Sequence, residues 1–233
     1  MLISGIQQFT MLDFPEKTAC IVFTAGCNFR CGYCHNPEFV LPEKIREIAD
    51  SFIPEEAVFS FLEQRRGLLD GVVITGGEPT LMGDLLEFIR RIKNMGFLVK
   101  LDTNGNNPAM VRRLLDEHLL DYIAMDIKTS LVQYKRLVGN RAKLHFLQES
   151  VSLIQKSGVE YEFRSTLIKE VHTDDILAEM IQLVHGAKRL SLQSFRPETT
   201  LAPVFATYHP FSSQEMDDIA HCFRDYVEEV VIR

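Results

Sequence analysis

The sequence predicts an α/β fold, a partial, open barrel of six strand–helix units, (β/α)6, in a single domain that spans residues 1–233. Three observations support this prediction. Short apolar strand patterns alternate with amphipathic helical patterns, which is typical of a parallel sheet covered by helices. Six units are fewer than the eight that close a barrel. No Pro-, Gly- or Ser-rich linker long enough to separate domains interrupts the chain, and its hydrophobic content of 46% is enough for one sizeable core.

Seven segments have the short apolar runs of strands, bounded by turn residues. The first reads Thr-Ala-Cys-Ile-Val-Phe-Thr, and the second, Gly-Val-Val-Ile-Thr, ends at two glycines. The predicted strands are residues 18–24, 71–75, 98–103, 122–127, 161–168, 190–195 and 229–232.

Six segments between these strands have the periodicity of amphipathic helices. Pro54 and Pro108 suit a first helical turn, where the missing N–H of proline costs nothing. Gly96 and Gly158 suit helix ends, because glycine readily adopts the left-handed conformation found there. The predicted helices are residues 54–64, 83–95, 108–118, 143–156, 173–184 and 212–227.

Unusual polar residues follow the predicted strands at their carboxyl ends. In parallel sheets these ends share one edge, and the chemistry of such folds collects there. A purely structural role would scatter carboxylates, lysines and glycines over both edges. Besides the cysteine loop after residue 24, the polar runs are residues 75–79, 102–105, 126–128, 164–166 and 193–196.

Three cysteines lie within eight residues, in the pattern Cys27-x3-Cys31-x2-Cys34. This spacing alone is equally compatible with an iron–sulfur cluster and with zinc, and it also allows a redox thiol group or a disulfide. Zinc would need a fourth ligand, and His35 directly follows Cys34, so it cannot easily turn back onto the same metal. Three thiolates on a four-iron cluster leave one iron open, which favours a catalytic centre.

The residues after the second strand allow both a functional and a structural interpretation. Gly76 and Gly77 let a ligand approach the backbone closely, although glycine is also common in ordinary turns. Glu78 either hydrogen-bonds an amine or caps the following helix. Tyr33, inside the cysteine loop, is expected to shield a cluster or to pack near an aromatic ligand.

The charged residues after the later strands are open to similar alternatives. Asp102 and Asp126 either hold a cation with backbone carbonyls, since hard cations prefer oxygen, or form salt bridges with Lys128 or Arg164. Lys128 meets an anionic group or neutralises these aspartates. Arg164 offers a planar fork that suits a carboxylate. His172 is expected to be structural rather than catalytic.

The composition limits the compartment and the partners. The formal net charge of −7 gives no basic surface for nucleic acid. Five cysteines, three of them clustered, do not form the framework of a secreted protein and indicate a reducing cytosol. No signal peptide is visible, and no apolar run approaches a membrane span. The sequence therefore predicts a cytoplasmic protein with neither nucleic acid nor membrane as a partner.

The motifs together resemble a known superfamily. The cysteine pattern with an aromatic residue before its last cysteine, and Gly-Gly-Glu-Pro after the next strand, resemble the radical S-adenosylmethionine superfamily over nearly the whole chain. Residues 34–37 (Cys-His-Asn-Pro), 102–105 (Asp-Thr-Asn-Gly) and 126–128 (Asp-Ile-Lys) resemble the glycyl-radical-enzyme activases. Residues 8–15 (Gln-Phe-Thr-Met-Leu-Asp-Phe-Pro) most resemble the activating proteins of anaerobic ribonucleoside-triphosphate reductase.

The resemblance implies a cofactor, a reaction and partners. Cys27, Cys31 and Cys34 would hold a [4Fe–4S] cluster whose fourth iron binds S-adenosylmethionine. Reductive cleavage would give methionine and a 5′-deoxyadenosyl radical, which removes a hydrogen atom from a glycine of the partner. That partner would be a glycyl radical enzyme, most simply anaerobic ribonucleotide reductase, and the electron would come from a donor of the flavodoxin or ferredoxin type.

The same resemblance assigns roles to the residues at the strand ends. The run from Gly76 through Gly77 to Glu78 would border the methionyl amine, and Arg164 with Thr166 would meet the carboxylate or ribose. A monovalent-cation site aligns with Asp102, Thr103, Asp126 and the Ala124 carbonyl. Lys128 would be a catalytic residue. Lys128 and Asp102 would contact the substrate peptide. Asp13 would touch the partner loop.

Two departures and two alternatives accompany this interpretation. Residues 37–53 contain no cysteine, so the chain looks like the short, single-cluster form, and residues 193–196 lack a histidine that some activases carry there. The enzyme alternative is a radical S-adenosylmethionine enzyme that acts on a small molecule, such as a deazapurine-forming synthase. The non-enzyme alternative is a metal-binding interaction module.

Overall fold

The computed structural model describes residues 1–34, 36–198 and 200–233. Its eight strands form one sheet in the order in which they occur in the chain. That order starts at β1 and ends at β8, so over the described residues the sheet is open rather than closed into a barrel. The prediction of an open α/β fold is thereby confirmed. The strands are β1 (Ile3–Thr10), β2 (Ala19–Thr24), β3 (Gly71–Gly76), β4 (Leu98–Thr103), β5 (Tyr122–Asp126), β6 (Glu160–Leu167), β7 (Arg189–Ser194) and β8 (Glu229–Ile232).

The helices begin and end at the residues that favour such boundaries. Pro108 opens α4, and the side chain of Asn107 caps that helix. Ser212 and Glu215 form a capping box at α8. None of the helices in the described residues is long and apolar enough to cross a membrane. The helices are α1 (Pro42–Glu47), α2 (Glu55–Glu63), α3 (Leu85–Asn94), α4 (Pro108–Asp116), α5 (Tyr134–Val138), α6 (Leu144–Gln155), α7 (Asp174–Val184) and α8 (Ser213–Arg224).

The predicted strands and helices are all observed, and over the described residues one further strand, two further α-helices and four short 3-10 helices join them. Each of the seven predicted strands agrees with the observed one to within one residue at each end. The sequence pattern did not indicate β1, α1 or α5. β1 pairs antiparallel with β2 and is irregular, with register shifts at both ends of the pairing. The exposed residues of β1 are Gln7, Gln8 and Phe9 in its second half, so it shows no continuous apolar run.

The described chain forms two compact units, and the expected single domain stays a prediction. Unit 1 comprises Met1–Asn28, Glu38–Thr103 and Asn107–Ile123. Unit 2 comprises Phe29–Pro37, Asn104–Asn106 and Ala124–Arg233. The cysteine loop is therefore divided, because Cys27 belongs to unit 1 whereas Cys31 and Cys34 belong to unit 2.

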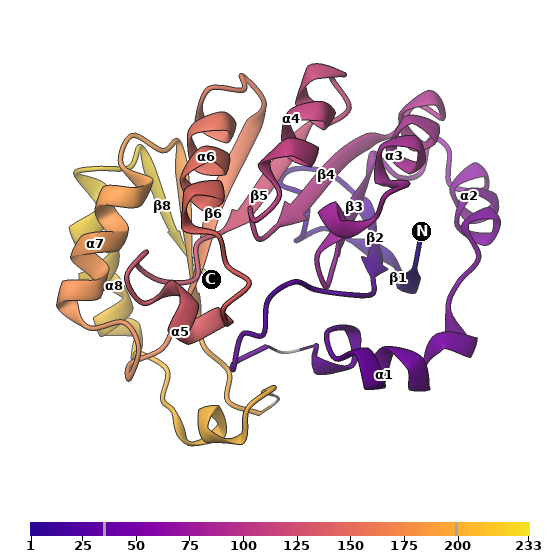
Figure 1. Cartoon of the computed structure of the whole chain (residues 1–233). Coiled ribbons are helices and arrows are strands. Elements are labelled where there is room, and N and C mark those ends of the chain that lie inside the picture. The colour runs from indigo at the N-terminus through magenta and orange to yellow at the C-terminus, as the bar shows by residue number, and fades with distance from the viewer. Residues whose placement is uncertain (35, 199) are drawn as a thin grey trace. The chain divides into compact units, whose positions relative to one another are not determined.

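Each unit has its own buried apolar side chains. In unit 1, Phe14 and Tyr122 pack with the inward residues of β2 and β3. In unit 2, Phe163 on β6 and Phe223 on α8 are completely buried. Figure 1 shows α6, α7 and α8 beside the strands β6 to β8 of that unit.

Candidate functional site

Parallel pairing brings strand ends to a common edge within each unit. In unit 1, β2 pairs in parallel with β3, and β3 with β4. β2 leads to Cys27, β3 leads to the Gly-Gly-Glu run, and β4 ends at Thr103. In unit 2, β6, β7 and β8 are parallel to one another. The predicted clustering of polar residues at the carboxyl edge is therefore present within unit 1.

Gly76 and Gly77 are required by the packing of the chain against itself. Gly76 has a φ of +117°, and a Cβ there would lie 2.3 Å from the backbone N and O of Thr24. A Cβ on Gly77 would lie 2.1 Å from the carbonyl oxygen of Gly26. The N–H of Gly77 donates to the carbonyl of Thr24, and the N–H of Glu78 donates to the carbonyl of Gly26. Both hydrogen bonds have a length of 2.8 Å. The end of β3 is thus joined to the residues directly before the first cysteine.

Glu78 caps the turn that follows it. The side chain is 1% exposed. Its Oε1 accepts hydrogen bonds from the N–H of Thr80 at 3.1 Å, from the Thr80 hydroxyl at 2.5 Å and from the Thr103 hydroxyl at 2.8 Å. Glu78 thus caps the short 3-10 turn Pro79–Leu81 rather than the helix expected near Met82, since α3 starts at Leu85, and contact with an amine stays a prediction. These bonds also fix the end of β4 to the end of β3.

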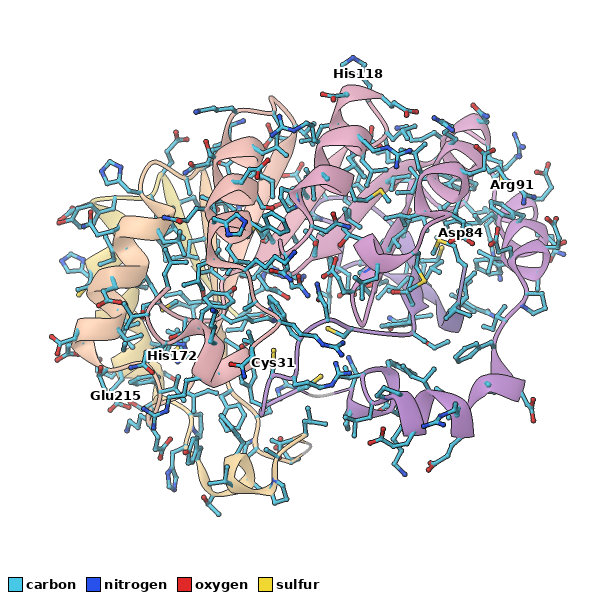
Figure 2. The ribbon with its side chains drawn as sticks, in the orientation of Figure 1. Cys31, Asp84, Arg91, His118, His172 and Glu215 are labelled. Carbon is cyan, nitrogen blue, oxygen red and sulfur yellow. The ribbon has the colours of Figure 1, made fainter. Side chains whose placement is uncertain are left out.

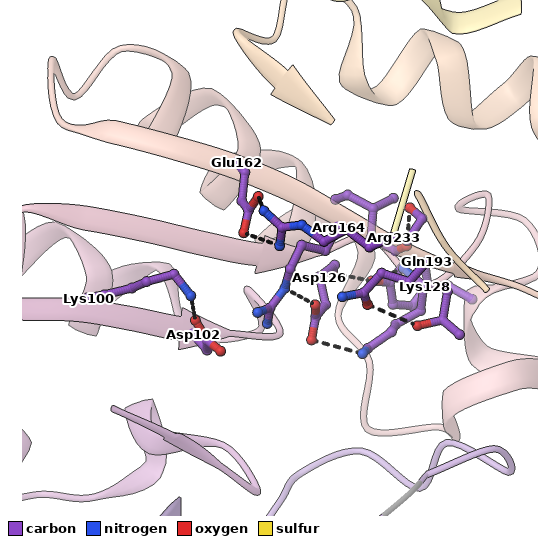
Figure 3. Close-up of polar contacts among 12 residues, drawn as sticks. Lys100, Asp102, Asp126, Lys128, Glu162, Arg164, Gln193 and Arg233 are labelled. Atoms are coloured by element: carbon purple, nitrogen blue, oxygen red, sulfur yellow. Dashed lines mark hydrogen bonds and ion pairs between the residues drawn. The ribbon is translucent and has the colours of Figure 1, made fainter. Parts of the chain in front are cut away.

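Asp102 pairs with a lysine that the sequence pattern did not single out. Lys100 Nζ lies 2.6 Å from Asp102 Oδ1, and the two residues are 1% and 9% exposed (Figure 3). Both lie on β4 two residues apart, so they share one face of the sheet. The detectable signal was a lysine between the apolar residues Val99 and Leu101 of the strand. Within unit 1, the carboxylate of Asp102 is thus neutralised by Lys100.

Asp126 is the centre of a charged triad in unit 2. Arg164 Nε donates to Oδ1 of Asp126, and Lys128 Nζ donates to Oδ2 of Asp126 (Figure 3). Both donor–acceptor distances are 2.9 Å. Burial would raise the pKa of Asp126, but the charges of Arg164 and Lys128 outweigh it and hold that pKa at about 2. Burial would lower the pKa of Lys128, but Asp126 more than offsets it and the pKa lies well above its usual range. The predicted salt bridges of Asp126 are therefore observed, and all three groups are charged at neutral pH.

Tyr33 of the cysteine loop lies beside this triad. The Lys128 ammonium is 5.9 Å from the centroid of the Tyr33 ring, within the range of a cation–π contact. Tyr33 is 3% exposed, and its hydroxyl finds no hydrogen-bond partner among the described residues. Burial raises its pKa well above the usual range, so the hydroxyl remains a neutral donor.

Burial distinguishes the Cys31 thiol from a redox-active thiol. The N–H of Cys34 donates to the carbonyl of Cys31 at 3.0 Å, which closes a tight turn (Figure 2 labels Cys31). Burial raises the pKa of the Cys31 thiol to about 11, with Lys128 opposing the rise. A redox-active thiol needs a lowered pKa, whereas a bound metal deprotonates its thiol outright.

The three cysteines therefore fit an iron–sulfur cluster by their chemistry and spacing. No group of three His, Cys, Asp or Glu side chains that could hold a metal ion is found among the described residues. The assignment of Cys27, Cys31 and Cys34 consequently rests on the donor set and stays a prediction. His35 lies outside the described residues.

The connection between β7 and α8 holds the cysteine loop in place. The N–H of Ala202 donates to the carbonyl of Gly32 at 2.8 Å. The ring of Phe205 packs on Gly32, where a Cβ would lie 2.1 Å from Cε2 of that ring. The Phe205 and Tyr33 ring centroids are 6.0 Å apart. Sequence reasoning missed Phe205, because a phenylalanine in a long connection carries no distinctive pattern.

The segment after β5 is held by His172 and Tyr134. Nδ1 of buried His172 accepts from the N–H of Ile168 at 2.9 Å, and its Nε2 donates to the Lys128 carbonyl at 3.0 Å (Figure 2 labels His172). The Tyr134 hydroxyl accepts from the N–H of Lys128 at 3.2 Å and donates to the Asp126 carbonyl at 3.3 Å. The expectation that His172 is structural agrees with these contacts.

Three buried polar atoms lie on or near the same segment without a described partner. They are the hydroxyls of Tyr33, Thr129 and Ser130. Leaving a buried hydroxyl unpaired costs about 1–3 kcal/mol. Together with the charged triad, these atoms indicate that this part of unit 2 suits a polar ligand.

The remaining predicted residue of unit 2, Thr166, lies on β6 two residues beyond Arg164. Its hydroxyl donates to the side-chain oxygen of Gln193 at 3.3 Å. Farther back on the same face, buried Glu162 accepts two bonds from Arg233, at 3.2 and 2.9 Å (Figure 3). This face of the β6–β7 pair is therefore polar along its length.

Asp13 is placed away from the cysteine loop. β1 runs antiparallel to β2, so the connection that contains Asp13 lies where β2 begins, and Cys27 lies beyond the end where β2 finishes. Six residues of strand at roughly 3.3 Å each separate the two ends by about 20 Å. The Asp13 carboxylate accepts the Thr10 hydroxyl at 2.5 Å. Contact of Asp13 with a partner loop stays a prediction.

The structure brings together part of the predicted site. Within unit 1, Glu78 contacts Thr103, and Asp102 lies on the same strand. Within unit 2, the triad, Tyr33 and Cys31 form one group. The predicted site residues of unit 1 are Cys27, Gly76, Gly77, Glu78, Asp102 and Thr103; those of unit 2 are Cys31, Tyr33, Cys34, Asp126, Lys128, Arg164 and Thr166.

The chain matches known proteins in sequence and in fold. The sequence pattern of the radical SAM superfamily matches residues 21–184. A Methanocaldococcus jannaschii protein, provisionally named a glycyl-radical enzyme activating enzyme, is 32% identical and is matched over 100% of this chain and 95% of its own. The 7-carboxy-7-deazaguanine synthase of Thermococcus kodakarensis is 26% identical over 74% of this chain and 72% of its own.

A solved structure shares the fold alone. The crystal structure of SuiB from Streptococcus suis superposes with a TM-score of 0.69 at 14% identity. The match covers 91% of this chain and 48% of that one, so the present chain spans about half the length of SuiB.

Proposed function

The chain belongs to the radical SAM (S-adenosylmethionine) superfamily, and from that premise we propose that it is an activating enzyme of a glycyl radical enzyme. The observation that carries the proposal is the match to the Methanocaldococcus jannaschii protein, which extends over the whole chain at 32% identity. The motifs at residues 34–37, 102–105 and 126–128 support the same assignment. The partner we propose is anaerobic ribonucleoside-triphosphate reductase, because residues 8–15 most resemble its activating proteins.

Family membership implies a [4Fe–4S] cluster and S-adenosylmethionine. Bound together they supply a one-electron cleavage of the sulfonium, and hence a radical able to remove a hydrogen atom from glycine. Cys27, Cys31 and Cys34 would hold the iron. Burial of Tyr33 and the cover of Phe205 over Gly32 would exclude water from the cysteine loop.

The triad of Asp126, Lys128 and Arg164 would orient the reacting molecules. Its charges are fixed before anything binds, so no reorganisation is needed when a ligand arrives. Arg164, with Thr166 on the same face, would meet the carboxylate or ribose of S-adenosylmethionine. Lys128 would contact the substrate peptide, and His172 and Tyr134 hold its backbone in place.

A monovalent cation at Asp102, Thr103, Asp126 and the Ala124 carbonyl is a further part of the proposal. Both carboxylates already pair with protein cations, Asp102 with one lysine and Asp126 with a lysine and an arginine. A bound cation would therefore compete with these ion pairs or share their oxygens.

The donor and compartment follow from the same chemistry. The electron would come from a flavodoxin or a ferredoxin-type protein. A reducing cytoplasm would keep the three clustered thiols available for iron. The composition gives no reason to add nucleic acid or membrane to the partners.

A small-molecule substrate is the second candidate function. The observation in its favour is the Thermococcus kodakarensis synthase, 26% identical over 74% of this chain. The activase is preferred because its relative is matched over more of both chains and at higher identity. Membership of an enzyme superfamily disfavours a non-catalytic metal-binding module.

Cleavage of S-adenosylmethionine by cysteine variants tests the assignment of the cluster. Cys31→Ala should abolish release of 5′-deoxyadenosine after anaerobic reconstitution with iron and sulfide. Cys222→Ala, which removes an exposed thiol on α8, should leave the release unchanged. Release from the Cys31→Ala protein at the wild-type rate would show that this thiol holds no essential iron.

A further inference from the structure

Unit 2 contains a groove beside α5 and α7, and we infer that it docks a basic, apolar segment of the protein substrate. The inference rests on the proposed activase function. The groove, here named the α5–α7 groove, has a volume of about 520 Å³. It is lined by Val132 and α5 on one side, by the segment from Glu170 into α7 on another, and by Phe205 and Tyr208. Figure 1 shows α5 and α7 within unit 2.

The groove lies next to the cysteine loop. Its three lining segments follow β5, β6 and β7, and β6 and β7 are parallel. Phe205 lines the groove and also packs on Gly32 between Cys31 and Cys34. A chain segment in the groove would therefore be separated from the cysteine loop by a single aromatic ring. A protein substrate must be held at such a short distance if one of its glycines is to reach the reaction centre.

The groove has apolar side chains beside its polar ones. Val132 is 77% exposed although it is an aliphatic residue. Leu137, Ile176 and Phe205 continue the apolar lining.

The rim of the groove is acidic. Three carboxylates line it, those of Glu170, Asp175 and Glu179, against one guanidinium, that of Arg136, which gives a net charge of −2. Glu170 pairs with His209. Asp175 and Glu179 form no ion pair within the described part of the chain. A segment that carries lysine or arginine beside apolar side chains would complement this lining.

Asp175 also has a structural explanation, because an acidic residue in the first turn of a helix is stabilised by the helix dipole. Glu179 lies one turn farther along α7 on the same side. The helix dipole does not stabilise Glu179, because this residue lies beyond the first turn of α7. Glu179 nevertheless adds a second negative charge to the same wall of the groove. The repetition favours recognition of a partner over helix capping alone.

A second cavity extends the groove in the direction of α6. It has a volume of about 470 Å³ and shares Val132 and Glu179 with the first. Its lining is otherwise apolar or uncharged, with glutamines from α6 and α7. Two adjoining cavities with one exposed valine between them suit an extended segment several residues long rather than a compact small molecule.

The test measures the dependence of glycyl radical formation on the concentration of the organism's anaerobic ribonucleotide reductase. Replacing Asp175 and Glu179 together by lysine should raise the half-saturating concentration of the reductase about tenfold at low salt, since rim charges steer association. The effect should shrink at high salt. The matched control replaces Asp217 and Asp218 together by lysine, which reverses two exposed carboxylates of α8 that do not line the groove.

A second pair of variants tests the apolar wall without changing any charge. Val132→Asn should raise the half-saturating concentration. Val204→Asn removes a similarly exposed valine, 52% exposed and outside the groove, and should have no effect. Release of 5′-deoxyadenosine without the reductase should be unchanged in all of these variants, because none touches the triad or the cysteine loop.

Two results separate failure of the docking site from failure of the proposed function. If every variant forms the glycyl radical with the half-saturation of the wild type, the groove does not dock the substrate and the activase assignment stands. If neither wild type nor variants form a glycyl radical while 5′-deoxyadenosine is still released, the proposed partner and the docking inference are both overturned.

Discussion

Replacing Asp126 by asparagine should destabilise the protein in a way that depends on pH. The carboxylate is the shared partner of Arg164 and Lys128, each 2.9 Å away. Asparagine keeps the size of the side chain but removes its charge, which leaves two partly buried cations without compensation. Breaking a buried ion pair from one side costs about 3–5 kcal/mol. The side chain of Asp126 is 23% exposed, so a value near the lower end is expected.

The pH-dependent part of this effect follows from the pKa. The folded pKa of Asp126 is about 2 against an ordinary value of 3.8, and each pKa unit corresponds to about 1.36 kcal/mol. The ionised carboxylate thus contributes about 2 kcal/mol. Because the folded pKa is lowered, this contribution is complete above pH 4 to 5 and is lost as pH falls through 2. Roughly half of it should be gone at pH 3.

Urea unfolding of the iron-free, reduced protein measures both parts. The free energy of unfolding of wild type and of Asp126→Asn is compared at pH 7 and pH 3, with Asp116→Asn, an exposed aspartate at the end of α4, as control. The gap between wild type and Asp126→Asn should narrow by about 1 kcal/mol between these pH values. The account of the triad would be refuted if the difference in unfolding free energy between wild type and Asp126→Asn were the same at pH 7 and pH 3. It would also be refuted if that difference were no larger than the one caused by Asp116→Asn.

Two further predictions concern glycines in tight contacts. Gly77→Ala should lower the free energy of unfolding in urea by more than about 2 kcal/mol, because its Cβ would meet a carbonyl oxygen at 2.1 Å. The control Gly83→Ala, at a glycine with open space around it, should leave the free energy of unfolding unchanged. Equal effects of the two substitutions would contradict the packing described. Gly32→Ala should lower the melting temperature of the iron-free protein because its Cβ would strike the Phe205 ring. Adding Phe205→Ala should recover part of that loss, whereas strictly additive losses would show that the two residues do not touch.

The sequence predicted regular elements better than irregular ones. Residues 71–75 form an apolar strand in both the pattern and the structure, because the burial that stabilises β3 leaves a direct trace in its composition. The half-exposed strand β1 leaves no such trace, since its pairing with β2 is made by the backbone. The five-residue helix α5 is too short to show a helical period.

The site was predictable in its residues but only partly in its contacts. The strand-end run at 126–128 predicted the pairing of Asp126 with Lys128, which lie at the end of β5 and just after it. The pairing of Asp102 with Lys100 was missed, although both lie on one strand, because a lysine is ordinarily exposed and the local pattern does not show that this one is buried. The contacts of Phe205 with Gly32 and of His172 with the Lys128 carbonyl join segments far apart in the sequence. They depend on tertiary packing, which no local pattern encodes.

The most direct test of the proposed function is electron paramagnetic resonance on the reduced, iron-reconstituted protein with S-adenosylmethionine and the organism's anaerobic ribonucleotide reductase. The account predicts the doublet of a glycyl radical that appears only when S-adenosylmethionine is present. Release of 5′-deoxyadenosine with no such doublet would contradict the reductase assignment and direct the search to another glycyl radical enzyme or to a small-molecule substrate.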